Sequence, residues 1–179
     1  MWLLILPMML LTALIPFLLL VQDMKFEQEK IKASHLTQML QIYHEASIVK
    51  MTRNPVPGGN SWANDVKQFL PPNIKNGSFW MQSFAGGRFP IDSAYYKSGN
   101  SCEVISFIRT TEGVVSLQNA SSTFVKLLTE NKISRAGVYN FQRKGFIDST
   151  GTTINLQNFQ PQLPIERNGV PVMYSRGSC

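Results

Sequence analysis

The sequence holds two cysteines, Cys102 and Cys179, whose thiols could form a disulfide or bind a metal ion. They show no Cys-x-x-Cys spacing and have no histidine pair nearby, so nothing indicates a zinc site. A disulfide would close a loop of 78 residues, tie the C-terminus to the body of the chain and require an oxidising compartment. Two separate thiols in a reducing compartment are the alternative, and the sequence leaves both open.

The two histidines, His35 and His44, lie in a segment that favours helix. Nine residues at about 100° each place them about 180° apart around a helix, so they cannot bind one metal ion from a shared face. There is no Gly-x-Ser-x-Gly nucleophile motif, and Gly86-Gly87-Arg88 lacks the Lys-Ser/Thr of a phosphate-binding loop. We therefore expect no catalytic residue, no cofactor and no metal, and a surface or packing role for each histidine.

The net charge of +6 and the isoelectric point near 9.5 raise the question of nucleic-acid binding. Beyond Pro55 there are twelve Lys or Arg against seven Asp or Glu, but they are spread singly, and only Arg143-Lys144 are adjacent. A DNA-binding face usually needs a cluster or stripe of cations. We expect no nucleic-acid partner; the same excess would suit anionic lipid headgroups close to a membrane.

Six aromatic residues fall within 18 consecutive positions: Phe79, Trp80, Phe84, Phe89, Tyr95 and Tyr96. Trp and Tyr often anchor protein interfaces, so Trp80, Tyr95 and Tyr96 are candidate partner-binding residues. A small sheet domain also needs large residues for its core, and alternation along a strand would bury half of them.

These residues must be positioned by a chain that opens with a long apolar run. The first 22 residues carry no charge, and 17 of the 20 from Trp2 to Val21 are apolar. Twenty helical residues span roughly 30 Å, the thickness of the hydrocarbon core of a bilayer. A signal peptide would have basic residues before the run and a small-x-small cleavage site after it, and neither is present. The sequence predicts an uncleaved transmembrane anchor over residues 1–22, with a removable signal peptide as the alternative.

Residues 23–54 contain no Pro or Gly before Pro55 and favour a helix that continues the anchor. Apolar residues recur at three- and four-residue intervals and form a stripe: Leu36, Met39 or Leu40, Tyr43, and Ala46 or Ser47. Packing against the chain's own domain is the favoured interpretation, and an oligomer through this stalk helix is the alternative. The helix is expected to end near Asn54.

Residues 55–179 are predicted to form one small α+β domain with a mainly antiparallel sheet and one or two short helices. Helices are predicted over residues 62–70 and 119–131. Strands are predicted over residues 79–84, 103–111, 114–117, 138–142, 145–148 and 152–156, with an irregular end that contains Pro161, Pro164 and Pro171.

Orientation in the membrane has two conflicting indications. Lys25, Lys30 and Lys32 follow the apolar run and would draw that end toward the cytoplasm. A disulfide would instead require the domain to lie on the oxidising side. We expect a single-pass inner-membrane protein with a periplasmic domain.

Several short motifs occur in order along the chain: Ile42-Tyr43, Asn54-Pro55-Val56-Pro57-Gly58, Leu70-Pro71-Pro72, Arg135-Ala136-Gly137-Val138, Leu163-Pro164-Ile165 and Gly169-Val170-Pro171-Val172. With the apolar N-terminal helix, this layout resembles the PilM-type proteins encoded in the gene clusters of conjugative type IVb, or thin, pili. The resemblance covers most of the chain. It implies a non-enzymatic inner-membrane subunit of the pilus assembly apparatus, which binds other assembly proteins through its soluble domain.

A hydrophobic helix that continues into an amphipathic one and packs on a sheet is also the plan of a type IV pilin. A prepilin has a basic leader that ends in Gly, then an aromatic residue and a Glu early in the apolar helix. This sequence begins Met1-Trp2 and has no acidic residue before Asp23. An atypical minor pilin or a pseudopilin-like filament component is therefore the alternative function.

Overall fold

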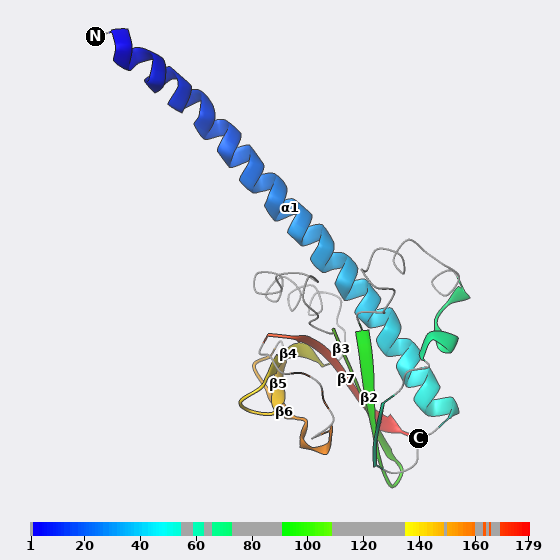
Figure 1. The fold of residues 1–179 in the computed structure, drawn as a ribbon. Helices are drawn as coiled ribbons and strands as arrows, with labels where there is room; N and C mark the ends of the chain where they lie inside the picture. The colour runs from blue at the N-terminus through cyan, green and yellow to red at the C-terminus, as the bar shows by residue number, and fades with distance from the viewer. Residues whose placement is uncertain are drawn as a thin grey trace.

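The computed structural model describes residues 2–54, 59–62, 66–72, 91–108, 135–148, 150–159, 163, 165 and 169–179; the side chains of residues 2–13 and of several later residues, Leu36 among them, lie outside this description. Within these ranges a long helix, α1 (Trp2–Arg53), lies across an antiparallel sheet and extends far beyond it (Figure 1). The prediction of a small α+β fold with a mainly antiparallel sheet is confirmed.

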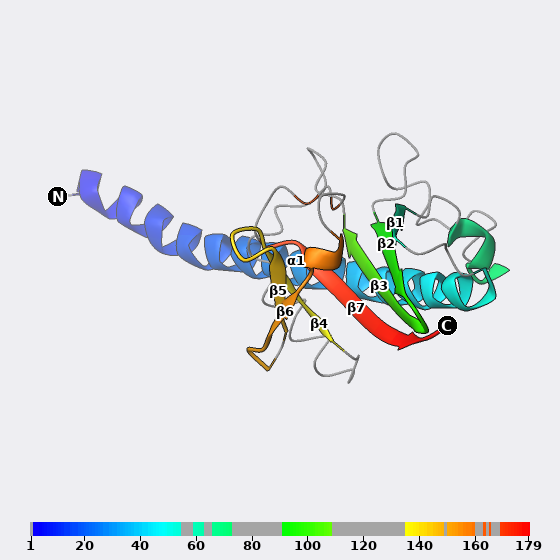
Figure 2. The ribbon, with the colours of Figure 1, turned by 90° about the horizontal axis from the view of Figure 1, so that it is seen from below.

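The sheet has seven strands in the described part of the chain: β1 (Gly59–Trp62), β2 (Ile91–Ser98), β3 (Ser101–Ile108), β4 (Ala136–Asn140), β5 (Gly145–Asp148), β6 (Thr153–Asn155) and β7 (Pro171–Ser178). Their spatial order is β1-β2-β3-β7-β4-β5-β6, and neighbouring strands are antiparallel. The last strand in the chain, β7, thus lies in the middle of the sheet, between β3 and β4 (Figure 2).

Helix α1 runs without a break through the predicted boundary between anchor and stalk. The helix includes Pro7 and Pro16, and from residue 17 to its end it holds neither Pro nor Gly, which favours an uninterrupted helix over that part. The helix ends at Arg53, because Pro55 disfavours a helical conformation in the residue before it, and the predicted end near Asn54 is confirmed. Lys50 and Arg53 lie in the last turn, where positive charge interacts favourably with the helix dipole.

The described residues include no helix that is long and apolar enough to cross a membrane. The transmembrane role of residues 1–22 therefore remains a prediction from the sequence.

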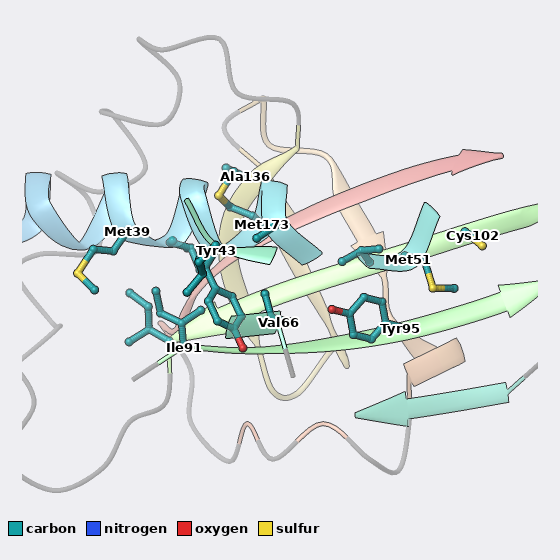
Figure 3. Close-up of a cluster of buried hydrophobic side chains, with 14 residues drawn as sticks. Met39, Tyr43, Met51, Val66, Ile91, Tyr95, Cys102, Ala136 and Met173 are labelled. Carbon is teal, nitrogen blue, oxygen red and sulfur yellow. The ribbon is translucent and has the colours of Figure 1, made fainter. Parts of the chain in front are cut away.

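The C-terminal part of α1 packs on the sheet and closes the first of two cores (Figure 3). Met39, Leu40, Tyr43, Ala46 and Met51 are buried there against side chains of β2, β3, β4, β7 and the turn η1 (Val66–Phe69). The prediction that the stalk stripe packs on the chain's own domain is confirmed for Met39, Leu40, Tyr43 and Ala46.

A second core lies on the opposite face of the sheet, because side chains alternate along each strand. On β3, Val104 and Ile108 belong to the core beneath α1, whereas Ile105 and Phe107 belong to the other. Residues around the turn η2 (Gln157–Phe159) cover the second core. The sheet is therefore stabilised from both sides, and α1 contributes to one side.

Several sequence predictions differ from the structure. The helix predicted over residues 62–70 is replaced by the end of β1 and the 3₁₀ turn η1. Strand β2 was not predicted, and the end of the chain, expected to be irregular, forms β7. The predictions over residues 79–84, 114–117 and 119–131 lie outside the described residues. The strand predicted over residues 145–148 is present as β5, and those over 138–142 and 152–156 overlap β4 and β6.

Candidate functional site

Five polar side chains form a connected row between α1 and the sheet. His44 and Ser47 come from one side of α1, and Ser93, Ser106 and Ser175 come from the adjacent strands β2, β3 and β7. The helix residues are three apart and so share a face, and Ser93 lies directly opposite Ser106 in the sheet register. All except Ser175 are at most 3% exposed. The row therefore lies inside the first core.

Hydrogen bonds link the whole row. His44 Nδ1 lies 2.9 Å from Ser106 Oγ, and His44 Nε2 lies 2.8 Å from Ser175 Oγ. Ser93 Oγ lies 2.7 Å from the Oγ of Ser106 and 2.7 Å from that of Ser47. Ser47 Oγ donates to the main-chain oxygen of Tyr43 at 2.8 Å. Each polar atom of this buried row thus has a partner, as burial in a protein core requires.

Burial lowers the pKa of His44 to about 4. The imidazole is therefore neutral near pH 7 and is a weak base. Its two nitrogens contact serine hydroxyls, which is the arrangement of a nucleophile and its base. A base with so low a pKa withdraws a proton poorly at neutral pH, so the geometry supports a structural role better than a catalytic one.

Tyr95 was a candidate partner-binding residue, and this prediction is corrected by its position. Its side chain is fully buried beneath α1 (Figure 3). The Lys50 ammonium lies 5.7 Å from the centre of the Tyr95 ring. Burial raises the pKa of its hydroxyl to about 12, although the nearby hydroxyls of Ser47 and Ser93 act in the opposite direction. These hydroxyls lie near the Tyr95 hydroxyl, but it forms no hydrogen bond with the described residues.

The other candidate aromatics have different outcomes. Tyr96 points to the opposite face of β2, is partly buried and packs edge-on against Phe159, with ring centroids 6.2 Å apart. It belongs to the second core rather than to an open surface. Trp80 lies outside the described residues. The sequence could not assign these rings because β2 itself was not predicted.

The two cysteines are joined by a disulfide between the start of β3 and the last residue of the chain. The Cα atoms of Cys102 and Cys179 are 5.7 Å apart, and the amide of Cys179 donates to the oxygen of Asn100 at 3.1 Å. On the other face of the same strand pair, Arg176 lies 3.6 Å from Glu103. The end of β7 is therefore fixed to β3 covalently, by main-chain pairing and by an ion pair.

His35 and His44 are not brought together. His35 is exposed, whereas His44 is buried in the row. Among the residues that the structure describes, no three His, Cys, Asp or Glu side chains are grouped so as to hold a metal ion. The buried row was missed because serines on three strands carry no signal until the strands and their order are known.

No protein-family model, curated protein or solved structure matches this chain.

Proposed function

We propose that this chain is a non-enzymatic inner-membrane subunit of a type IV pilus assembly apparatus of the conjugative, thin-pilus kind. In this proposal residues Trp2 to Val21 span the membrane, and the sheet domain binds other assembly proteins in the periplasm. The proposal starts from the PilM-like motifs of the sequence, among them Asn54-Pro55-Val56-Pro57-Gly58 and Arg135-Ala136-Gly137-Val138.

The observation that carries the proposal is the contrast along α1. Its C-terminal part is built into the core of the domain, whereas Leu14, Ile15 and Phe17 to Leu20 are 45–63% exposed. These residues surround the helix, since they occupy nearly every position over two turns. A helix that is apolar all round needs an apolar environment, and a lipid bilayer supplies one.

The disulfide supports the periplasmic orientation. A bond between Cys102 and Cys179 persists in an oxidising compartment and is rare in a reducing one. The three lysines that follow the apolar run favour the opposite orientation by the positive-inside rule. We give the disulfide greater weight, because it joins the central strand of the sheet to its neighbour.

Fractionation of cells that express the full chain tests the anchor. We expect the protein in the membrane fraction, resistant to carbonate and released by detergent, whereas a variant that lacks residues 2–21 should be soluble. A membrane-impermeant protease should digest the domain in spheroplasts. Recovery of the full-length chain without detergent would contradict the anchor.

In-cell photocrosslinking tests whether the chain contacts proteins of the pilus assembly apparatus. A photoreactive residue at the exposed position Val49 is expected to capture inner-membrane proteins of the pilus apparatus, and the same residue at buried Ile105 should capture none. Unchanged pilus assembly in cells without the chain would contradict the proposed role.

A minor pilin is the second candidate, and the shape of the molecule favours it specifically. One helix protrudes at its N-terminal end and packs on an antiparallel sheet at its C-terminal end, which is the plan named above for pilins (Figure 1). A minor pilin would be recovered in sheared filaments with a processed N-terminus. An assembly subunit would remain in the membrane with its N-terminus unchanged.

A further inference from the structure

The buried row has a single arrangement of protons that satisfies all its hydrogen bonds. Its fixed end is the main-chain oxygen of Tyr43, which can accept but not donate, so Ser47 must donate its proton there. Ser47 then has no proton for Ser93, and Ser93 must donate to Ser47. By the same step, Ser106 must donate to Ser93.

The direction of these hydrogen bonds determines which nitrogen of His44 carries the hydrogen. Because the Ser106 proton is already used, Nδ1 of His44 must carry a hydrogen and donate it to Ser106. In the neutral ring Nε2 is then bare, and it accepts the proton of Ser175. The imidazole is thus held as the Nδ1–H tautomer, and the partly exposed Ser175 is the last residue of the hydrogen-bonded row.

Protonation of Nε2 would place a positive charge where the described residues offer no negative one. The described residues of the sheet that face α1 carry no carboxylate. They include Ile91, Ser93, Tyr95 and Lys97 of β2, Cys102, Val104, Ser106 and Ile108 of β3, and Met173, Ser175 and Gly177 of β7. On α1 itself, Tyr43 is buried, Lys50 is positive and Glu45 is exposed, where its carboxylate accepts from Gln41. Glu103 lies on the opposite face of the sheet, next to Arg176.

The sheet has a second source of stability besides its contact with α1. The second core, on the other face, joins residues of β2, β3, β4, β5 and β7, and the disulfide ties β7 to β3. The sheet therefore keeps one core and its covalent link when α1 leaves the other face.

We propose that His44 is an acid-sensitive latch: as the neutral Nδ1–H tautomer it holds α1 on the sheet, and its protonation releases the C-terminal part of α1 while the strands stay paired. Desolvation by burial is the cause of the low pKa of this group, so the released form takes up the proton first. Because the pKa is depressed in the docked state, docking is strongest above the free value of 6.5, weakens as the pH falls, and weakens no further below about 4. Between pH well above 6.5 and pH well below 4, the equilibrium constant for release should rise about 300-fold in total, and about 100-fold of this rise falls between pH 7 and 4.

Imidazole nitrogen NMR and amide exchange on the full chain in detergent micelles test the latch. The nitrogen shifts at pH 7 should place the hydrogen of His44 on Nδ1. As the pH falls from 7 to 4, amides from Met39 to Met51 should lose protection, while the amides that pair β2 with β3 keep theirs. The intrinsic pH dependence of exchange is corrected with the unfolded chain.

Two neutral variants and one matched control complete the test. His44→Asn and His44→Gln retain amide hydrogen bonding but cannot titrate, so docking in either should lose its pH dependence between 6.5 and 4. His35→Gln removes the exposed histidine of the same helix and should behave as the unmodified chain. An Nε2–H tautomer, equal loss of protection in helix and sheet, or the same pH profile in a folded His44 variant would overturn the proposal. If both variants fail to fold, the tautomer and exchange pattern of the unmodified chain still decide.

Discussion

The two halves of α1 belong to one unbroken helix, but they are stabilised in different ways. From Met39 onward, one side of the helix is buried on the sheet, and that side combines apolar residues with the polar pair His44 and Ser47. From Leu14 to Leu20 the helix is apolar and exposed. The first half is distinguished by its apolar composition, whereas the second half is distinguished by its packing against the strands beneath it. In our proposal the first half lies in a lipid bilayer, whereas the second half packs on the sheet of the same chain.

Loss of the disulfide should have the largest effect on this contrast. Replacing both Cys102 and Cys179 with Ser removes a link across 77 residues, which should lower the free energy of unfolding of the domain by about 4 kcal/mol. With the sheet destabilised, amides in the C-terminal half of α1 should exchange nearly as fast as those before it. Urea denaturation and amide exchange measure both effects. Reducing agent should destabilise the unmodified chain and leave the double variant unchanged; equal sensitivity of the two would contradict the prediction.

Truncation of a buried residue on α1 should come next. Leu40 is fully buried in the first core, so Leu40→Ala should cost about 3 kcal/mol through lost burial and the cavity left behind. Val49, on the same helix, is 40% exposed, and Val49→Ala should change stability by less than about 0.5 kcal/mol. Urea denaturation compares the two. Similar costs would mean that the stripe does not hold the helix on the sheet.

The sequence predicts features that depend on neighbouring residues and misses those that depend on distant ones. The end of α1 follows from Pro55, and the buried stripe follows from helical spacing, so both are predicted correctly. Strand β7 follows a proline-rich segment and was expected to be irregular. It pairs with β3 and β4, and Pro171 does not prevent this, because it occupies the first position of the strand, where a missing amide proton is tolerated.

The polar row also depends on residues that are distant in the sequence, and the sequence does not predict it. His44 alone indicates little, and Ser93, Ser106 and Ser175 look like ordinary polar positions in the sequence. Their meeting depends on the order β2-β3-β7, which places the C-terminal strand beside β3. No spacing along the chain encodes that neighbour. A buried serine on a strand is recognisable only after its facing helix is known.

Interrupting the polar row should have a smaller effect than truncating Leu40. Ser106→Ala leaves Nδ1–H of His44 without its acceptor and Ser93 without a donor, so the free energy of unfolding should fall by about 2 kcal/mol. Thr52→Val is the control, because the Thr52 hydroxyl bonds the oxygen of Ile48 at an exposed site and should contribute little. Urea denaturation at pH 7 measures the free energy of unfolding of both variants. A neutral effect of Ser106→Ala would mean that the row is dispensable for docking.

The smallest effect on the domain should come from the exposed half of α1, and this result would separate the halves most clearly. Leu18 is 57% exposed and touches neither core, so Leu18→Ser should change the free energy of unfolding of the sheet domain by less than about 0.5 kcal/mol. The same change places a hydroxyl where the proposed anchor meets lipid, so partition of the full chain into lipid vesicles should weaken. Vesicle flotation measures partition, and Val49→Ala, which lies beyond the apolar run, should float as the unmodified chain does. If Leu18→Ser destabilised the domain and left flotation unchanged, the first half of α1 would be a part of the domain, and the division of the helix into two environments would be wrong.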